Sequence, residues 1–393
     1  MTQIFIHWFV ICLLRTGNYC IKIFVREYRF IYLFLPLNFH AAEIIPLYFY
    51  RSAGQRDYLF WFRPADLPPP KQVFRILPHY RAFKYGLIQG QLDLRKALAR
   101  QYPKSSPDSF VVTNGASEAL DLTLRVLAKS GNLSKNKVLL PRPYYYTYPH
   151  LVRYAAMEPV YTDMIEGHID FDDFEKKVGA CKAVIINSPS NPAGRVESVK
   201  TLKKIEKLCA DLGVYVLSDD VYKDIIYVSE NYSMKGPSVV TIHSFSKTYS
   251  LCGLRVGYLR SSDPLLVNGT IEMKTRTSMN TNILAQAMAY EATKVPRTFV
   301  EKQVKIWRQR RDLIYAGLSD LGLDLWKPEG AFYVLPKIKN PRKFVSDMFY
   351  RHKVITYLGE WFGAPDRVRF SYALDVEKIE EGLKRVRKYM AHR

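Results

Sequence analysis

Residues 244–257 read SFSKTYSLCGLRVG, and this stretch decides how the rest of the chain is interpreted. The amine of Lys247 lies among hydroxyl side chains and is followed by the guanidinium of Arg255. An amine with these neighbours suits a cofactor that is held covalently and carries a phosphate. The stretch follows the apolar run Val239–His243 and leads into Val256–Leu259, so we expect it to connect two strands. A lysine that forms a Schiff base there would make the chain an enzyme.

From about Pro46 onward, short β-branched runs alternate with helical patterns, which is typical of an α/β protein. The runs Ala183–Asn187 and Val214–Leu217 indicate fully buried strands, because neither alternates between apolar and polar residues. Other elements are expected as strands at 110–112 and 137–140 and as helices at 92–102 and 116–127. We therefore predict a mostly parallel sheet covered by helices on both faces.

After about Ser261 the pattern changes to long helices, of which 297–321 is the longest, followed by a mixed tail. Strands are expected at 331–335, 354–356 and 368–371. Apolar residues at helical spacing from Val376 to Val386 predict a final helix. This part of the chain is predicted to be a second, smaller α+β domain.

Residues 1–44 differ from the rest in their high content of Ile, Phe, Tyr and Leu. Neither apolar run reaches the roughly 20 residues that span a bilayer, because Arg15 ends the first and charged residues precede the second. No positive charge precedes the first run, so a secretory signal is also a poor match. Three interpretations stay open: a peripheral anchor, an extra packing segment, and residues upstream of the true translation start, which we favour.

Charge and cysteine content narrow the class of protein. The net charge of +21 is compatible with nucleic acid, an anionic surface or ligands that carry phosphate. However, lysines 200, 203, 204 and 207 share one face of a predicted helix whose other face is apolar, so we expect a solvated surface and no nucleic-acid partner. The five cysteines form no CxxC pair and lack companion histidines at metal-ligand spacing. They predict a reducing cytoplasm and no metal site.

Three further segments follow predicted strands directly. Residues 114–117 (Asn-Gly-Ala-Ser) open a helix, whose free N–H groups and dipole favour a phosphate. Asn191 precedes a proline after one strand, and Asp219 follows another with Tyr222 three residues on. Each segment alone is explained as a turn or a helix cap. Because such strand ends share one edge of an open α/β sheet, we expect the three segments to meet residues 244–257 in one site.

The ordered set of motifs resembles a fold-type I, class I/II aminotransferase that binds pyridoxal 5'-phosphate (PLP), from about Pro46 to the C-terminus. The motifs are Tyr85 with Gly90 and Leu94-Arg95, Asn114-Gly115-Ala116-Ser117, Pro143-Tyr144-Tyr145, Asn191-Pro192, Asp219 with Tyr222, Lys247 with Arg255, and Arg369. The resemblance implies a large domain on a mostly parallel seven-stranded sheet and a smaller α+β domain. It divides the chain into an extension (1–44), a segment packing with the small domain (45–84), the PLP-binding domain (85–275) and the small domain (276–393).

The resemblance also implies roles for single residues. Lys247 would hold the cofactor aldehyde and move a proton, with Asp219 at the pyridine nitrogen and Tyr222 at the phenolic oxygen. Asn191 would donate to the same oxygen and help to bind substrate, whose α-carboxylate would be held by Arg369. The remaining cofactor contacts would come from Gly115, Ala116, Ser117, Tyr145, Ser244, Ser246 and Arg255. Tyr85 would reach the cofactor of a neighbouring subunit, which predicts a homodimer with shared active sites.

The implied function is amino-group exchange between an amino acid and a 2-oxo acid in a ping-pong cycle. A PLP-dependent lyase or decarboxylase is the alternative, because the sequence does not fix which substrate bond lies perpendicular to the ring. A nucleic-acid-binding or regulatory protein is the less favoured second class. Residues 253–257 and Tyr85-Gly86 somewhat resemble the histidinol-phosphate aminotransferase subgroup, whereas residues 61–66 depart from the family's substrate loop and leave the side-chain specificity open.

Overall fold

The computed structural model describes residues 10–13, 19–25, 29–35, 66–130, 134–228 and 232–391. Contacts divide the chain into two units, 1–58 and 59–393. The first unit contains an antiparallel three-stranded sheet of β1 (Val10–Leu13), β2 (Tyr19–Val25) and β3 (Arg29–Leu35). Much of 1–44, the first part of the segment 45–84 (up to residue 65) and all but Asp66 of the loop 61–66 lie outside the described ranges, so the roles predicted for them stay predictions. Within those ranges, no helix is long and apolar enough to cross a membrane.

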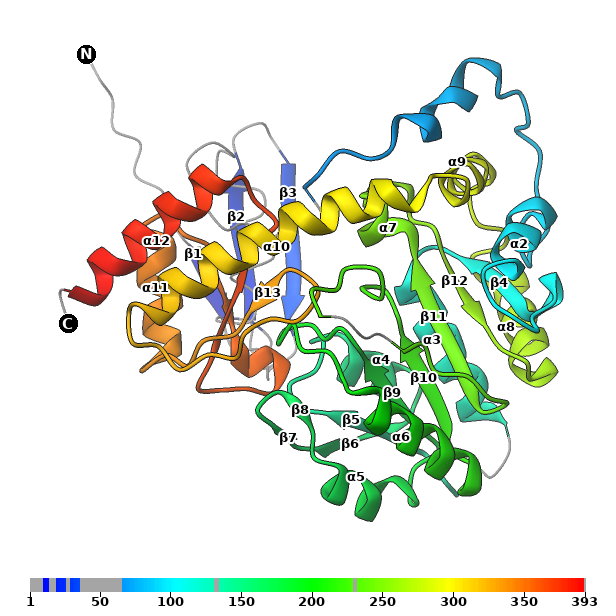
Figure 1. Ribbon diagram of the computed structural model, residues 1–393, viewed down its shortest axis with the longest axis horizontal. Helices are drawn as coiled ribbons and strands as arrows, with labels where there is room; N and C mark the ends of the chain where they lie inside the picture. The colour runs from blue at the N-terminus through cyan, green and yellow to red at the C-terminus, as the bar shows by residue number, and fades with distance from the viewer. Residues whose placement is uncertain are drawn as a thin grey trace. The chain divides into compact units, whose positions relative to one another are not determined.

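The second unit is built on a seven-stranded sheet with the order β4-β12-β11-β10-β9-β5-β6 (Figure 1). The strands are β4 (Phe110–Thr113), β5 (Lys137–Pro141), β6 (Glu158–Thr162), β9 (Ala183–Asn187), β10 (Tyr215–Asp219), β11 (Val239–Ser244) and β12 (Gly257–Arg260). Only β12 runs antiparallel to its two neighbours, β11 and β4. The other pairs are parallel, so the predicted mostly parallel sheet is confirmed.

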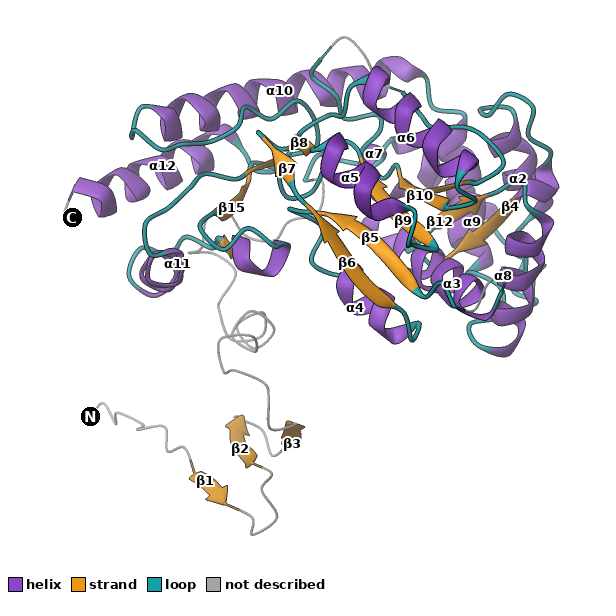
Figure 2. Cartoon of the chain, turned by 90° about the horizontal axis from the view of Figure 1, so that it is seen from below, coloured by secondary structure: helices purple, strands orange, loops and turns teal. Residues whose placement is uncertain are grey.

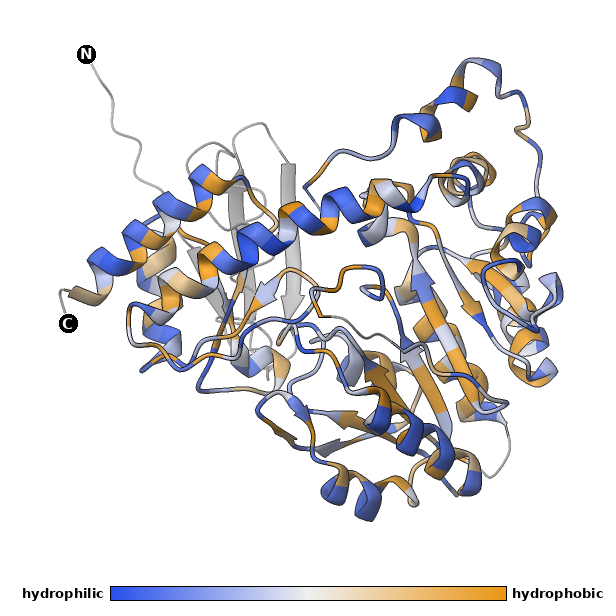
Figure 3. Ribbon diagram, viewed as in Figure 1, coloured by the Kyte–Doolittle hydropathy of each residue, from blue (hydrophilic) through white to orange (hydrophobic). Residues whose placement is uncertain are grey.

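Helices cover both faces of this sheet (Figure 2). They are α2 (Leu92–Ala99), α3 (Ala116–Lys129), α4 (Tyr148–Tyr154), α5 (Phe171–Val178), α6 (Val199–Asp211), α8 (Pro264–Arg276) and α9 (Ile283–Thr293). Ile185 packs with residues of α3, α4 and α8, whereas its neighbours Val184 and Ile186 pack with α5 and α6. Successive side chains of a strand point to opposite faces, which explains why β9 is apolar from Ala183 to Ile186 (Figure 3).

A second sheet, with the order β13-β15-β14, forms in the C-terminal part from β13 (Tyr333–Val334), β14 (Tyr357–Leu358) and β15 (Val368–Ser371). The helices α10 (Arg297–Ser319), α11 (Pro341–Tyr350) and α12 (Val376–Ala391) belong to the same part. Trp307 of α10 and Ile379 of α12 are fully buried in one apolar cluster with Phe332. The predicted α+β character is confirmed, and the boundary between residues 275 and 276 stays a prediction.

The strand expected at 354–356 is wrong. The Val354 N–H donates to the carbonyl of Met348 at 2.9 Å, so this residue closes the turn after α11 and the strand begins at Tyr357. The strand expected at 331–335 is shorter, because Ala331 turns away to donate its N–H to the carbonyl of Ile225 at 2.9 Å.

Candidate cofactor and substrate site

The predicted site segments meet at one edge of the large sheet. β4, β9, β10 and β11 end there, and the antiparallel β12 begins there with Gly257 paired to both Ser244 and Thr113. A Cβ on Gly257 would lie 2.7 Å from the His243 carbonyl oxygen and 2.8 Å from the Ala116 nitrogen. Only a glycine at this position allows the start of α3 to approach the end of β11 so closely.

Gly115 and Arg255 form the turn expected to bind phosphate. Gly115 has φ +80°, and a Cβ on it would lie 2.5 Å from Nη2 of Arg255. The exposed Arg255 guanidinium donates to the carbonyls of Cys252 (3.1 Å) and Asn114 (3.4 Å) and has further N–H groups to offer. Ala116 is partly buried and Ser117 is exposed in the first turn of α3.

Two residues that the sequence reasoning missed hold this turn in place. Glu118 accepts hydrogen bonds from the backbone and side-chain amides of Asn114, at 2.6 and 3.1 Å. The fully buried Lys274 of α8 donates to the same carboxylate at 3.0 Å. An acidic residue in the first turn of a helix was the available signal for Glu118, whereas nothing in the local sequence connects it to Lys274.

Lys247 lies on the short helix α7 (Phe245–Thr248), directly after β11. Its Nζ is 5.9 Å from the ring centroid of Tyr222 and 5.8 Å from that of Phe332. The Tyr222 hydroxyl is in turn 2.9 Å from the hydroxyl of Tyr333. The structure therefore brings Lys247 and Tyr222 together beside an aromatic wall from the C-terminal part of the chain.

Ser244 caps the helix that carries Lys247. Its Oγ accepts a hydrogen bond from the Ser246 N–H at 3.0 Å and lies 2.7 Å from the Ser246 hydroxyl. At the other end of this helix, the Thr248 hydroxyl donates to Asp224 at 3.1 Å. These bonds fix both ends of the short helix.

Asp219, the last residue of β10, is a buried carboxylate. Its Oδ2 accepts a 2.6 Å hydrogen bond from the Tyr148 hydroxyl, and its Oδ1 accepts a 3.4 Å bond from the Val221 N–H. Burial raises the pKa of Asp219 to about 6, although the Tyr148 bond opposes that rise. Asp219 forms no ion pair with any described residue, and a buried carboxylate of this kind is suited to receive a positively charged group.

Arg369, on β15, is also fully buried. Its guanidinium carbon lies 4.6 to 4.7 Å from the ring centroids of three aromatic residues, which are Tyr333, Tyr357 and Phe362. Its Nη1 donates to Oδ1 of Asn191 at 2.9 Å, while its Nε is buried and has no hydrogen-bond partner among the described residues. The arginine is thus held in position and keeps unused donor capacity.

Asn187 joins the Asn191 loop to β10 and was missed by the sequence reasoning. Its Oδ1 accepts from the Asn191 N–H at 2.8 Å, and its Nδ2 donates to the Asp219 carbonyl at 2.9 Å. As the last residue of a predicted strand, Asn187 gave no sign that its side chain would turn back to the sheet edge.

Tyr145 and Tyr85 are the remaining residues that were predicted to bind the cofactor. The Tyr145 ring packs edge-on against Tyr148 at 5.5 Å, which places it beside the partner of Asp219. Tyr85 is 84 % exposed and lines a separate open hollow with Phe83 and Asn282, so the structure does not bring it to the Lys247 cluster of its own chain.

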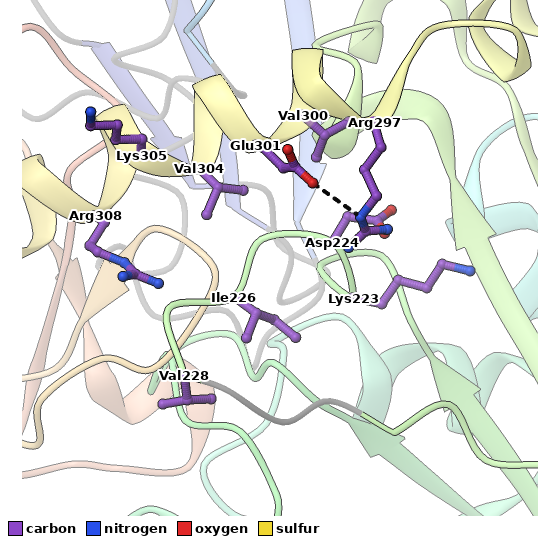
Figure 4. A pocket seen from close by; sticks show the side chains of 10 residues that line it. All are labelled: Lys223, Asp224, Ile226, Val228, Arg297, Val300, Glu301, Val304, Lys305 and Arg308. Atoms are coloured by element: carbon purple, nitrogen blue, oxygen red, sulfur yellow. Dashed lines mark ion pairs between the residues drawn. The ribbon is translucent and has the colours of Figure 1, made fainter.

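A separate pocket of about 410 Å³ lies between the segment after β10 and the start of α10 (Figure 4). Arg297 pairs there with Glu301 at 3.7 Å and with Asp224 at 3.9 Å, beside the apolar side chains of Ile226 and Val300. Asp224, which also accepts from Thr248, links this pocket to the helix of Lys247.

Comparison with known proteins gives a consistent result. Residues 71–386 match the family described as aminotransferase class I and II. The probable aspartate/prephenate aminotransferase of Aquifex aeolicus is 33% identical over 331 residues, covering 78% of this chain and 83% of its own. The probable aspartate aminotransferase of Methanocaldococcus jannaschii is 35% identical over 289 residues, covering 70% and 76% respectively.

A solved structure, the aspartate aminotransferase of Thermotoga maritima, has a TM-score of 0.81 and 27% identity over 89% of this chain and 96% of its own. Both the fold and the sequence therefore assign the same family. The chain belongs to the class I and II aminotransferases of fold type I, PLP-dependent enzymes that exchange an amino group between an amino acid and a 2-oxo acid.

Proposed function

We propose that Lys247, Asp219 and Tyr222 are the catalytic residues of this aminotransferase. The observation that carries the proposal is the convergence at one sheet edge of an amine, a buried carboxylate and the Gly115–Arg255 turn. When bound, PLP supplies an aldehyde that condenses with amines and a ring that withdraws electrons from the substrate. Lys247 holds the aldehyde before substrate arrives and then moves the proton at the substrate α-carbon.

The described residues fit the parts of the cofactor. The phosphate binds at Gly115, Ala116 and Ser117 and at the side chains of Ser244, Ser246 and Arg255. Asp219 would pair with the ring nitrogen, and Tyr145 would stack on the ring. Because Oδ1 of Asn191 accepts from Arg369, its amide NH₂ is the group left to donate to the phenolic oxygen, together with the hydroxyl of Tyr222.

Arg369 binds the α-carboxylate of the substrate. Two observations support this role of Arg369. Its Nε is buried and has no hydrogen-bond partner among the described residues, and the aromatic side chains around it orient the planar guanidinium. Asn191 completes this end of the site, because it contacts Arg369 directly. Aspartate, prephenate and the aromatic amino acids form the first substrate panel, since they appear in the names of relatives. The oxo acids of those amino acids are added because the reaction exchanges an amino group with an oxo acid.

The active enzyme is a homodimer whose subunits share their active sites. The segment around Tyr85 supports this assembly, because Phe83 (78 % exposed), Tyr85 (84 %) and Leu87 (54 %) present a largely uncovered apolar surface. Tyr85 reaches the cofactor phosphate of the partner subunit. The free thiols Cys181 and Cys209, both buried in apolar surroundings, fit the reducing cytoplasm predicted from the sequence.

An absorbance titration tests the catalytic assignment. The purified protein with PLP is expected to show the visible band of a lysine-bound cofactor, and an amino acid added alone should convert the cofactor to its amine form. Lys247→Ala should lack that band, and Lys235→Ala, which changes an exposed lysine next to the ring of Tyr232, should keep it. A band that persists unchanged in Lys247→Ala rejects the proposal.

A further inference from the structure

Tyr148 holds the carboxylate of Asp219 from within the core. It is the first residue of α4 and only 2 % exposed, and its hydroxyl donates to Oδ2 of Asp219 at 2.6 Å. Its ring is fixed by the apolar cluster between the sheet and α3 and by the edge of Tyr145. A ring packed in this way can place its hydroxyl in one direction only.

The two oxygens of Asp219 are therefore unequal. Oδ2 carries the short bond from Tyr148, while Oδ1 receives one long bond of 3.4 Å from the Val221 N–H. Each oxygen accepts one of these bonds, but the long bond at Oδ1 is the weaker of the two, so Oδ1 is better able to accept a strong bond from a further donor. With the hydroxyl of Tyr148 in place, rotation of the carboxylate about its bond to Cβ would break the short bond.

We propose that Tyr148 is a positioning residue that acts through Asp219. Its hydroxyl fixes the rotation of the carboxylate and favours the ionised form, so that Oδ1 presents its negative charge to the protonated ring nitrogen of PLP. This inference rests on the proposed function, because it assumes that Asp219 pairs with that nitrogen.

Several ionisable groups face Asp219 from the surrounding elements. Tyr148 lies on α4, Lys247 on α7 and Asp220 next in the chain, while Tyr145 and Tyr222 face the Tyr148 hydroxyl. Burial raises the pKa of Asp219, the Tyr148 bond and Lys247 lower it, and Asp220 raises it. Burial and Asp219 also raise the pKa of Tyr148 well above its usual range, so this phenol stays a donor at any working pH.

Burial raises the pKa of Asp219, and the hydrogen bond from Tyr148 is the largest influence that lowers it. Loss of the Tyr148 hydroxyl removes this influence. The pKa of Asp219 then rises above its present value of about 6. Since the carboxylate must be ionised to pair with a pyridinium, the pH below which the protein loses PLP should move upward.

Tyr148→Phe tests the proposal, and Tyr215→Phe is its matched control. Tyr215 is at the other end of β10, and its hydroxyl donates to the carboxylate of Asp263 at 2.7 Å. The measurement is the dissociation constant of PLP from about pH 5 to about pH 9, by fluorescence titration of the cofactor-free protein. Tyr148→Phe should weaken binding about tenfold at neutral pH and move the acid limb upward, and Tyr215→Phe should change neither.

A double-mutant cycle separates positioning from a general effect on structure. In an Asp219→Asn background, Tyr148→Phe should no longer change PLP affinity, because the residue through which it acts is already lost. An equal loss of affinity in both backgrounds overturns the proposal, and so does a Tyr148→Phe enzyme with the wild-type affinity and pH profile.

Failure of the proposed function gives a different pattern. If the wild-type protein binds no PLP, or if Asp219→Asn binds it as tightly as the wild type does, the assignment of Asp219 to the ring nitrogen is wrong. If those two proteins behave as expected and Tyr148→Phe alone matches the wild type, only the role of Tyr148 is lost. Circular dichroism of each variant checks that the phenylalanine ring keeps the core packed.

Discussion

Arg369 of the C-terminal sheet donates a 2.9 Å hydrogen bond to Asn191 in the loop after β9, although 178 residues separate them in the chain. Asn191 is in turn bound to Asn187, whose side chain donates to the backbone of Asp219. The group proposed to hold the substrate carboxylate is therefore connected, through one buried and two partly buried hydrogen bonds, to the strand that carries the carboxylate of Asp219. Such a connection fixes the distance between the two binding groups, on which productive orientation depends.

Arg369→Lys should impair substrate binding selectively. Lysine keeps the charge but loses the planar group that packs between three aromatic rings and bonds Asn191. We expect the KM for the amino acid to rise about 100-fold, as loss of ~3 kcal/mol of charged hydrogen bonding implies, with unchanged PLP affinity. Steady-state kinetics and PLP titration measure the two effects.

The neighbouring Arg367 supplies the control for this prediction. Its guanidinium packs on Trp326 at 3.9 Å and donates to the Leu335 carbonyl at 3.0 Å, away from Asn191. Arg367→Lys should lower stability without raising KM. Equal rises in KM for both variants would show that Arg369 has no special part in substrate binding.

Gly115→Ala should weaken PLP binding. The residue has φ +80°, and the new Cβ would meet Nη2 of Arg255 at 2.5 Å, so the guanidinium must shift from its position beside the turn. We expect a loss of affinity of about tenfold or more together with ~1–2 kcal/mol of stability. Gly213→Ala is the matched control, because φ is +64° there and no atom lies within 4 Å of the added Cβ. It should lose similar stability and bind PLP normally, whereas equal affinity in both variants would contradict the role of the Gly115 turn.

Local patterns predicted every strand of the large sheet except β6, because apolar burial is a local signal and most of β6 is not fully buried. The limits of β9, Ala183–Asn187, were predicted to the residue, since every position but the last is apolar and buried. β10 was predicted to end at Leu217, yet it continues to Asp219. Its last two residues are polar and belong to the strand only because their backbones pair with β9 and β11, which no local pattern reveals.

The site was predictable only as a list of residue types at strand ends. Lys247, Tyr222 and Asp219 were predicted because strand-end motifs and a family resemblance indicate them directly, and their catalytic roles stay a proposal. Tyr148, Asn187 and Lys274 were missed, because each acts through a bond to a residue that is distant in the chain, 71 positions away for Tyr148 and Asp219. Tyr148 follows the motif tyrosine Tyr145 by three residues, so helical spacing was the one available hint.

Hybrid dimers should test the shared active site. Lys247→Ala and Tyr85→Ala proteins are each expected to be poorly active alone. In a hybrid dimer, one site carries both substitutions and the other carries neither, so mixing equal amounts after dissociation should restore about a quarter of the wild-type activity if subunits pair at random. The strong exposure of Tyr85 makes its substitution harmless to the fold of one chain. No gain over the separate proteins would contradict a cross-subunit role for Tyr85.

Asp219→Asn should make the cofactor-free protein more stable at neutral pH while it weakens PLP binding. Burial raises the pKa of Asp219 to about 6 from the 3.8 of a free side chain. A carboxyl group with a raised pKa in the folded state stabilises the fold below its unfolded pKa, and this contribution is lost as pH rises from the lower value through the higher one. Above that range, the ionised carboxylate costs up to ~3 kcal/mol, by the conversion of pKa shifts into free energy.

The asparagine removes this cost, so its stability should exceed that of the wild type at about pH 8 and approach it at about pH 4. Urea unfolding of the cofactor-free proteins at both pH values gives the two free energies. Asp263→Ala is the control, because that carboxylate accepts a 2.9 Å bond from the Leu265 N–H at the start of α8 and its loss should destabilise the protein. If Asp219→Asn shows no gain at the higher pH, Asp219 is not held against its ionisation by burial. Burial of the carboxylate would then give no reason for a positively charged pyridinium to be favoured beside it.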